Sequence, residues 1–308
     1  MRRTLTALAA TTVAALTLAA CGGGSSGGPL GGPAGASAAP TDTISVGSAN
    51  FTESSLLGEI YAQALEAKGI KVSRHLSLGS RETYFPALKD GSLDLVPEYT
   101  GTLLQYLDPK AEQTSADDVY AALKKAIPAP LAALDKSAAE DKDAVVVTKE
   151  VAQRYNATSI ADLAPHCGDL VFGGPPEFLK RPDGTPGIQK IYNCTFKSFV
   201  SLDAGGPLTL AAVKTNQVQA ADLFTTNPQI QTDNLVALTD PKNNFSAQNV
   251  VPIINSTKAT DQVKQILNAV SAKLTTQDLV DLNGQLTAPN PVDPAVAAKQ
   301  WLSKAGLA

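Results

Sequence analysis

Residues 80–96 read SRETYFPALKDGSLDLV, and this stretch decides the fold. Ser80 is suited to cap a helix, apolar residues follow it up to Leu88, and Gly91 breaks the chain before an apolar run at 93–96. A helix that leads through a short turn into an apolar strand is the repeating unit of sheets flanked by helices. The stretch therefore predicts an α/β fold.

The same alternation precedes this stretch. Ile44 and Val46 alternate with polar residues as in a strand, and residues 70–78 do the same. Between them, Thr52 is expected to cap a helix that Gly69 ends. The apolar face of that helix comprises Leu56, Leu57, Ile60, Ala64 and Leu65. Strands that alternate with helices predict a mostly parallel sheet.

The rest of the chain repeats the pattern in a second unit and ends in a helical tail, where Trp301 is expected to dock the final helix. The predicted helices lie at 99–107, 117–127, 149–155, 208–215, 261–274, 276–283 and 294–305, and the predicted strands at 145–147, 170–172, 218–224 and 250–254.

Two α/β units with a helical tail predict a bilobal protein whose chain crosses between the lobes near Ala144 and near Val250. Residues 43–143 and 250–308 form the first expected lobe, and residues 144–249 form the second. A ligand cleft is expected between them at the carboxyl ends of the strands, where loops and helix N-termini converge.

The N-terminus has the pattern of a lipoprotein signal. Arg2 and Arg3 precede an apolar run at 5–18, and Leu18-Ala19-Ala20-Cys21 follows it. This pattern predicts a cleaved signal peptide at 1–20, a lipid group on Cys21 and a Gly/Ser/Ala/Pro-rich tether at 21–42. We expect a protein anchored by lipid on the extracytoplasmic face of the cell membrane. An ordinary signal peptide with a buried or disulfide-bonded Cys21 is the alternative.

Charge and cysteine content narrow the function further. The formal net charge is −4, and no basic cluster occurs, which argues against a nucleic-acid partner. Cys167 and Cys194 are expected to pair in an oxidising compartment, the alternative being two buried free thiols. A zinc site is disfavoured because only His166 lies near either cysteine in the sequence.

Catalytic chemistry finds little support in the sequence. The only histidines are His75, expected to face solvent from a strand, and His166, expected in a loop beside Cys167. Neither has a recognisable acid, base or nucleophile as a partner. We expect a protein that is not an enzyme and that carries neither a cofactor nor a metal.

Five motifs carry a resemblance to a known family. The two most informative are VGSANFTE at 46–53 and ALKDGSLDLVPEYTGT at 87–102; GGPPEF at 173–178, RPDG at 181–184 and ADLFTT at 221–226 continue it. They resemble the ProX/OpuC-type (OpuAC-like) substrate-binding lipoproteins of osmoprotectant ABC transporters, which capture glycine betaine, choline, carnitine and related compounds. The resemblance spans nearly all of the sequence after the tether.

The resemblance implies a bilobal periplasmic-binding-protein-like fold of type II, with two α/β lobes joined by a two-segment hinge. It implies a monomer that closes on a small molecule and docks on the permease subunit of an ABC importer in the membrane. Tyrosines are expected to surround a quaternary ammonium group, which aromatic faces attract by cation–π interaction. Basic residues and hydroxyls are expected to hold the carboxylate of the ligand.

Several positions match the family's binding residues. Tyr99 fits a wall of the tyrosine cage, Thr102 a hydroxyl that faces the anion, and Arg181 the carboxylate clamp. Phe224 stands where the family has a cage tyrosine and keeps the aromatic face. Tyr99, Arg181 and Phe224 also have an ordinary structural alternative, namely core packing for Tyr99 and Phe224 and a surface turn for Arg181.

Other positions depart from the family pattern. Asp143 and Gln248 replace expected cage tyrosines, and Ala49 replaces a lysine. Asn50 and Thr52 are expected to add polar contacts, while Glu98 is expected to accept hydrogen bonds at the lobe surface. The incomplete cage leaves open a more polar, hydroxyl-rich or aromatic ligand, and a sensor or scaffold module is a second alternative.

Overall fold

The computed structural model describes residues 42–308. The predicted signal peptide, Cys21 and all of the predicted tether except Asp42 lie outside the described residues. Within the described range, none of the helices has the length and apolar content that crossing a bilayer requires.

The first sheet has five strands in the order β2-β1-β3-β10-β4. Its strands are β1 (Thr43–Gly47), β2 (Lys71–His75), β3 (Leu95–Tyr99), β4 (Leu131–Ala133) and β10 (Val250–Asn255). β1 pairs in parallel with β2 and β3, whereas β10 runs antiparallel to β3 and β4. Strands β2, β1, β3 and β4 of this sheet therefore run in one direction, as the predicted mostly parallel sheet requires. β10 is reversed because it enters at the end where β3 leaves, with Val250 opposite Tyr99.

The second sheet repeats this plan in the order β7-β6-β8-β5-β9. Its strands are β5 (Asp143–Thr148), β6 (Val171–Gly174), β7 (Ser198–Ser201), β8 (Ala220–Phe224) and β9 (Leu235–Ala237). β6 is parallel to β7 and β8, while β5 is antiparallel to β8 and β9. Each sheet thus takes in one strand, β10 or β5, that arrives from the other sheet and runs against its neighbours.

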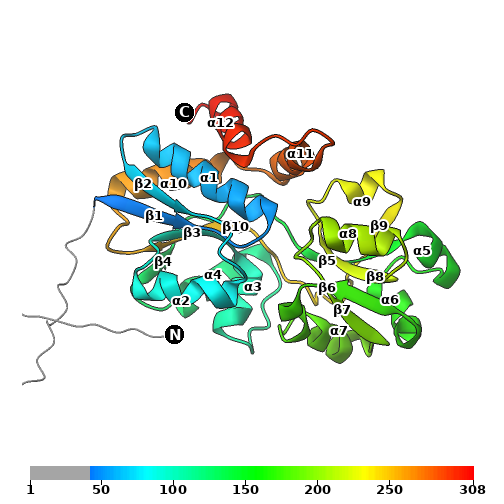
Figure 1. The fold of residues 1–308 in the computed structure, drawn as a ribbon. Helices are drawn as coiled ribbons and strands as arrows, with labels where there is room; N and C mark the ends of the chain where they lie inside the picture. The colour runs from blue at the N-terminus through cyan, green and yellow to red at the C-terminus, as the bar shows by residue number, and fades with distance from the viewer. Residues whose placement is uncertain (1–41) are drawn as a thin grey trace, which may run out of the picture. The chain divides into compact units, whose positions relative to one another are not determined.

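Helices cover both faces of each sheet (Figure 1). On the first sheet, α1, α10, α11 and α12 enclose one apolar core, in which Trp301 is 5% exposed, and α2, α3 and α4 enclose another. These helices are α1 (Thr52–Glu66), α2 (Arg81–Asp90), α3 (Thr100–Leu107), α4 (Ala116–Ala126), α10 (Asp261–Lys273), α11 (Thr276–Thr287) and α12 (Pro294–Ala305). Trp301 docks the final helix as expected. We call this half lobe 1.

The half built on the second sheet is lobe 2. Helices α5, α6 and α7 border one of its two apolar cores, and α8 borders the other. Its helices are α5 (Lys149–Tyr155), α6 (Ile160–Leu163), α7 (Thr185–Tyr192), α8 (Pro207–Lys214) and α9 (Gln229–Thr232), with 3-10 turns at Ala164–Asp169 and Pro176–Leu179. The predicted bilobal α/β fold is confirmed.

Two chain segments connect the lobes, residues 134–142 between β4 and β5 and residues 238–249 between β9 and β10. They run side by side: Glu140 and Asn249 form an antiparallel bridge, and the Asp141 amide donates to the Gln248 carbonyl oxygen at 3.1 Å. The backbone N–H of Gln248 in turn donates to the side-chain carboxylate of Glu140 at 3.0 Å. Paired segments of this kind form the two-segment hinge that the fold class implies.

Most predicted elements are present, but some details differ. Thr52 is not the cap of α1; it is the first helical residue, and the N-cap position is Phe51, which makes no side-chain cap bond. His166 lies in a 3-10 turn rather than a loop, and its ring stacks on Tyr155 at 4.4 Å. The short strands β4, β7 and β9 and the helices α6, α7 and α9 are absent from the sequence prediction.

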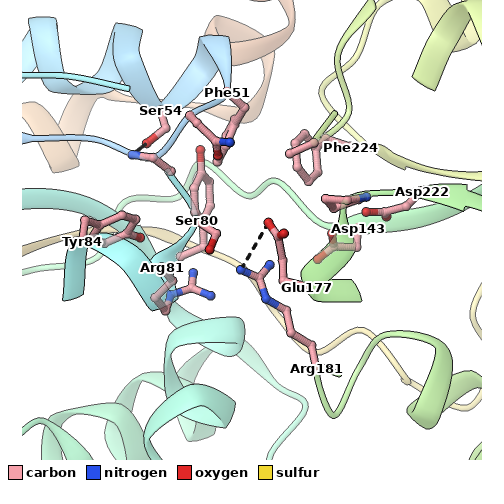
Figure 2. Close-up of a pocket in the computed structure, with 15 residues that line it drawn as sticks. Phe51, Ser54, Ser80, Arg81, Tyr84, Asp143, Glu177, Arg181, Asp222 and Phe224 are labelled. Carbon is pink, nitrogen blue, oxygen red and sulfur yellow. Dashed lines mark hydrogen bonds and ion pairs between the residues drawn. The ribbon is translucent and has the colours of Figure 1, made fainter. Parts of the chain in front are cut away.

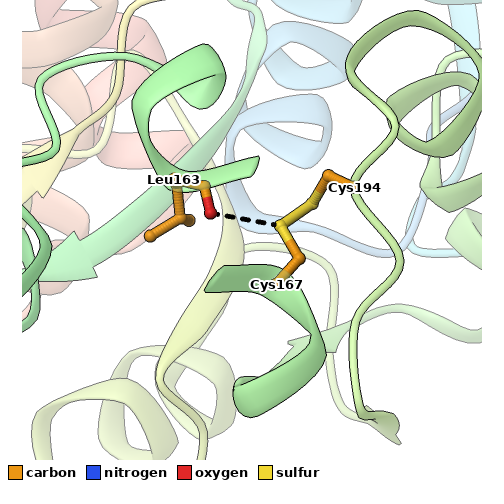
Figure 3. Close-up of a disulfide and its surroundings, with 3 residues drawn as sticks. All are labelled: Leu163, Cys167 and Cys194. Carbon is orange, nitrogen blue, oxygen red and sulfur yellow. Dashed lines mark hydrogen bonds between the residues drawn. A yellow bond between two sulfur atoms is a disulfide. The ribbon is translucent and has the colours of Figure 1, made fainter. Parts of the chain in front are cut away.

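The predicted disulfide between Cys167 and Cys194 is present (Figure 3). It joins the 3-10 turn at Ala164–Asp169 to the segment that follows α7, and both cysteines are buried in the core that α5, α6 and α7 border. The carbonyl oxygen of Leu163 lies 3.6 Å from Cys167 Sγ. The bridge closes a sequence separation of 27 residues within lobe 2.

Replacing both cysteines with alanine should lower the free energy of unfolding by roughly 3–4 kcal/mol, because a closed loop of this length restricts the unfolded chain. Urea denaturation followed by circular dichroism measures the difference. The wild-type protein in excess dithiothreitol is the control and should lose a similar amount. Equal stability of the oxidised protein and the double variant would show that the bridge contributes nothing.

Candidate functional site

A pocket opens between the lobes at the ends of their central strands (Figure 2). Lobe 1 contributes Phe51, after β1, and Tyr99, at the end of β3; lobe 2 contributes Phe224, at the end of β8, and Asp143, at the start of β5. The pocket is narrow: the space in it that a water-sized group can occupy is about 40 Å³.

Three aromatic rings form one side of the pocket. The ring centroid of Phe51 lies 5.9 Å from that of Tyr99 and 5.0 Å from that of Phe224, so the set joins the two lobes. Tyr99 and Phe224 are predicted site residues, whereas Phe51 is missed although it lies in the 46–53 motif. Its position directly after a strand at the carboxyl edge of the sheet is the signal that could have identified it.

Tyr99 is held in place by a buried polar network. Its hydroxyl donates to Glu53 Oε1 at 2.6 Å, and Glu53 Oε2 accepts from Thr226 Oγ1 and from Asn283 Nδ2, both at 2.6 Å. Burial, together with the charge of Glu53, raises the pKa of Tyr99 well above its ordinary value, so the phenol stays protonated. The network fixes the Tyr99 ring and also joins lobe 1 to Thr226 of lobe 2.

Beneath the aromatic set lies a buried ion pair that the sequence analysis does not identify. Arg81, at the start of α2, donates from Nε and Nη2 to the two carboxylate oxygens of Glu98 at 2.8 and 2.7 Å. The Tyr84 hydroxyl donates to Glu98 Oε1 at 2.6 Å. Glu98 accepts hydrogen bonds as expected, but it has no exposed surface, so the expectation that it lies at the lobe surface is wrong. A carboxylate this deep requires the charge of Arg81.

Thr102 and Gln248 lie beside this ion pair, in a small adjoining hollow that Tyr99 and Arg181 also line. Thr102 Oγ1 accepts a hydrogen bond from Arg81 Nη2 at 2.8 Å. Gln248 Oε1 accepts from the amides of Gly101 and Thr102, each at 3.0 Å, and so caps the first turn of α3. Gln248 Nε2 is buried without a partner among the described residues and remains available as a donor.

Arg181 reaches the pocket from lobe 2 and pairs with an acid of lobe 1. Its Nε and Nη2 donate to the two carboxylate oxygens of Glu82, both at 3.2 Å, and Glu177 lies 3.9 Å away. Burial opposes ionisation of Glu82, but the hydrogen bonds and charge of Arg181 prevail and lower its pKa to about 2. The guanidinium therefore faces the cleft while bridging the two lobes.

The lobe 2 wall is acidic. Asp143 and Asp222 both line the pocket, and Asp183 lies close enough that its charge raises the pKa of Asp222. Burial is the largest cause of the raised pKa of all three carboxyl groups, and that of Asp183 reaches about 7. Asp143 is a predicted site residue. Asp183 and Asp222 are missed, although they lie in the 181–184 and 221–226 motifs.

The remaining predicted positions lie at the edge of the site. Asn50 is exposed and lines the pocket, as does buried Ala49. Thr52 lines a separate, wider hollow that Phe51 and Phe224 also border, and it does not reach the pocket itself. The structure thus brings Asn50, Tyr99, Asp143, Arg181 and Phe224 to one pocket, places Thr102 and Gln248 next to it, and leaves Thr52 apart.

The sequence of this chain is similar to those of known transport proteins. A family profile described as the substrate-binding domain of ABC-type glycine betaine transport systems matches residues 42–304. The glycine betaine-binding protein YehZ of Escherichia coli (strain K12) is 28% identical over 279 residues, which cover 85% of this chain and 90% of YehZ. The ergothioneine transport permease/ergothioneine binding protein EgtU of Helicobacter pylori (strain G27) is 28% identical over 83% of this chain. The chain spans only 46% of the length of EgtU.

A solved structure described as a glycine betaine/carnitine/choline ABC transporter has the same fold. The TM-score is 0.68, with 86% of this chain and 99% of that chain covered at 23% sequence identity.

Replacing Arg81 with methionine should lower the free energy of unfolding by about 3–5 kcal/mol, because it leaves the fully buried Glu98 carboxylate without its counter-charge. Arg154→Met is the matched control, since Arg154 pairs with Glu150 on an exposed helix face and should cost under about 1 kcal/mol. Chemical denaturation measures both variants. Similar small losses in the two would contradict a structural role for the buried pair.

Proposed function

This chain belongs to the family of substrate-binding domains of ABC-type glycine betaine transport systems, and we propose that it captures a small ammonium osmoprotectant between its lobes. The observation that carries the proposal is the aromatic set Phe51, Tyr99 and Phe224, drawn from both lobes, with the Arg181 guanidinium lining the same pocket. Glycine betaine, choline and carnitine are the candidate ligands.

The chemistry of the pocket suits both ends of such a ligand. Aromatic faces attract a trimethylammonium group by about 0.5–2 kcal/mol per ring, depending on how far the ring is desolvated. The planar guanidinium of Arg181 has five N–H donors, so it can bind a ligand carboxylate while keeping contact with Glu82. Phe51 provides an aromatic face in a cage that has Asp143 and Gln248 at two of its positions.

Closure of the lobes explains how binding would be signalled to the membrane. A ligand held by Tyr99 on lobe 1 and by Phe224 and Arg181 on lobe 2 gains some of its contacts only when the lobes close, which shifts the population toward the closed form. We propose that residues 43–143 with 250–308 close on residues 144–249 about the paired connecting segments. The closed form would dock, as a monomer, on the permease subunit of an ABC importer.

A more polar or aromatic ligand is the second candidate. Asp143 and Asp222 in the pocket favour a ligand with hydrogen-bond donors over one that is purely quaternary. EgtU, an ergothioneine transport permease/ergothioneine binding protein, is 28% identical to this chain. Ergothioneine therefore belongs in the ligand screen beside glycine betaine, choline and carnitine.

We expect residues 42–308, purified without the tether, to show a rise in melting temperature with at least one of these four compounds. Phe51→Ala and Phe224→Ala should each weaken the binding of that compound by about 2- to 30-fold in calorimetry, because each variant removes one aromatic face. Phe196→Ala is the control: its ring packs on Phe172 in the lobe 2 core and should change stability without changing affinity. Unchanged affinity in both pocket variants would contradict the site, and the absence of binding by all four compounds would contradict the function.

We further propose that Cys21 carries a lipid after removal of residues 1–20 and holds the protein on the extracytoplasmic face of the cell membrane. The sequence Leu18-Ala19-Ala20-Cys21 after an apolar run supports this. Intact mass spectrometry of the protein extracted from membranes should show a chain that begins at Cys21 with a diacylglyceryl mass added, and Cys21→Ser should lack that mass. A mature chain with an unmodified Cys21 would contradict the anchor.

A further inference from the structure

The lobe 2 wall of the pocket holds a pair of carboxylates that the aromatic set and the arginines leave unused. Asp222 is 1% exposed and lines the pocket, and apart from Asp143, with which it can share a proton, no described residue donates a hydrogen bond to its carboxylate oxygens. Asp143, on the neighbouring strand, lines the same pocket. A buried acceptor without a donor is costly, so these oxygens require a partner.

Strand register sets the two carboxylates side by side. Asp143 on β5 lies opposite Phe224 on β8, and Asp222 precedes Phe224 by two residues. Side chains two residues apart on a strand share one face of the sheet, so Asp143, Asp222 and Phe224 project from the same face, with the two acids at diagonal positions within reach of each other. Figure 2 shows the three side chains at the lobe 2 side of the pocket.

The nearby arginines act on this pair through their charges, which partly offset the rise that burial causes in the pKa of Asp143, but they form their ion pairs with other acids. Arg81 makes a two-bond ion pair with Glu98, and Arg181 makes one with Glu82 and lies near Glu177. In the described part of the chain, neither Asp143 nor Asp222 takes part in an ion pair. Burial and the charges of Asp143 and Asp183 raise the pKa of Asp222 well above its ordinary value. Asp143 and Asp222 lie within hydrogen-bonding reach of each other and can share one proton. A donor from outside the protein can satisfy the oxygens that remain.

A bound metal does not fit this need. The described residues contain no group of three or more histidine, cysteine or acidic side chains placed to hold a metal ion. A quaternary ammonium group can contact the aromatic set, but it has no N–H hydrogen to donate to these oxygens. An N–H donor on the ligand satisfies both the charge and the hydrogen bond of the pair.

We propose that Asp143 and Asp222 form a subsite for N–H donors, so that the solute of this protein is an ammonium zwitterion or cation with at least one N–H group. This inference rests on the proposed function and refines its ligand class. The aromatic set would contact the carbon-bearing faces of the ligand's cationic end, while the carboxylate pair would bind its N–H hydrogens. A fully methylated ligand would leave the pair unsatisfied, and binding sites built for an N–H donor discriminate strongly against analogues that lack it.

The methylated glycines provide a direct test. Glycine betaine, N,N-dimethylglycine and sarcosine share a carboxylate and a positive charge at neutral pH but carry zero, one and two N–H donors. Calorimetry on residues 42–308 should show N,N-dimethylglycine binding at least about ten-fold more tightly than glycine betaine, which corresponds to one hydrogen bond to a charged group. Equal or tighter binding of glycine betaine would overturn the proposal.

Two variants assign the effect to the subsite. Asp143→Asn and Asp222→Asn preserve side-chain shape and should each reduce the preference for N,N-dimethylglycine over glycine betaine to about three-fold or less. Asp169→Asn, an exposed acid of lobe 2 outside the pocket, should leave the preference unchanged. Because the wild-type comparison needs no substitution, a variant that fails to fold does not block the test. A preference that survives intact in both folded variants would overturn the proposal.

The remaining outcomes distinguish failure of the proposed subsite from failure of the proposed function. If none of the methylated glycines binds, the two variants are tested with the tightest-binding compound among choline, carnitine and ergothioneine. Tightest binding by choline or carnitine, which have no N–H group, would overturn the subsite while the proposed function stands. Tightest binding by ergothioneine, with at least a ten-fold loss in either variant, would support the subsite. Unchanged affinity in both would overturn it. Failure of every compound to bind would overturn the proposed function itself.

Discussion

The charge of Glu98 is the constraint on which the pocket depends. Its carboxylate is fully buried at the end of β3, where desolvation would be prohibitive without a paired cation. Arg81 supplies that cation from the first turn of α2 and also donates to Thr102, while Tyr84 of the same helix donates to Glu98. A single ion pair therefore connects α2, β3 and α3 and fixes the floor below the aromatic rings.

This arrangement sets the electrostatic character of the cleft. Arg81 pairs with Glu98 and Arg181 with Glu82, so the acids of lobe 2 face the pocket without an ion pair of their own. Asp143, Asp183 and Asp222 all have raised pKa values because they are buried, although the charge of Arg181 acts in the opposite direction. In the proposed function, the aromatic faces and the acidic groups together recognise a positively charged solute.

The two lobes are also coupled through neutral and polar contacts. Phe51 packs on Phe224 across the cleft, and Glu53 binds Thr226 of lobe 2 together with Asn283 of α11. The same Glu53 holds the Tyr99 hydroxyl, so the ring that faces the pocket is part of the contact between the lobes. In the proposed function, these contacts link occupancy of the site to the position of the lobes.

The sequence by itself determined the elements and the family. Periodic apolar residues and helix breakers located most strands and helices, with α5 and α12 placed at their observed bounds, because these signals are local. The motifs also predicted Tyr99, Arg181 and Phe224 as site residues, and the departure from the family pattern predicted Asp143; all four line the pocket. The sequence predicted the strands β10 and β5 but not that they run antiparallel to their neighbours, since strand direction depends on how the chain returns from the other lobe. Only the tertiary structure showed that Phe51 completes the aromatic set, that Arg81 forms its ion pair with Glu98, and that Asp222 has no ion pair with a described residue. These properties arise from contacts between residues far apart in sequence, which no local pattern encodes.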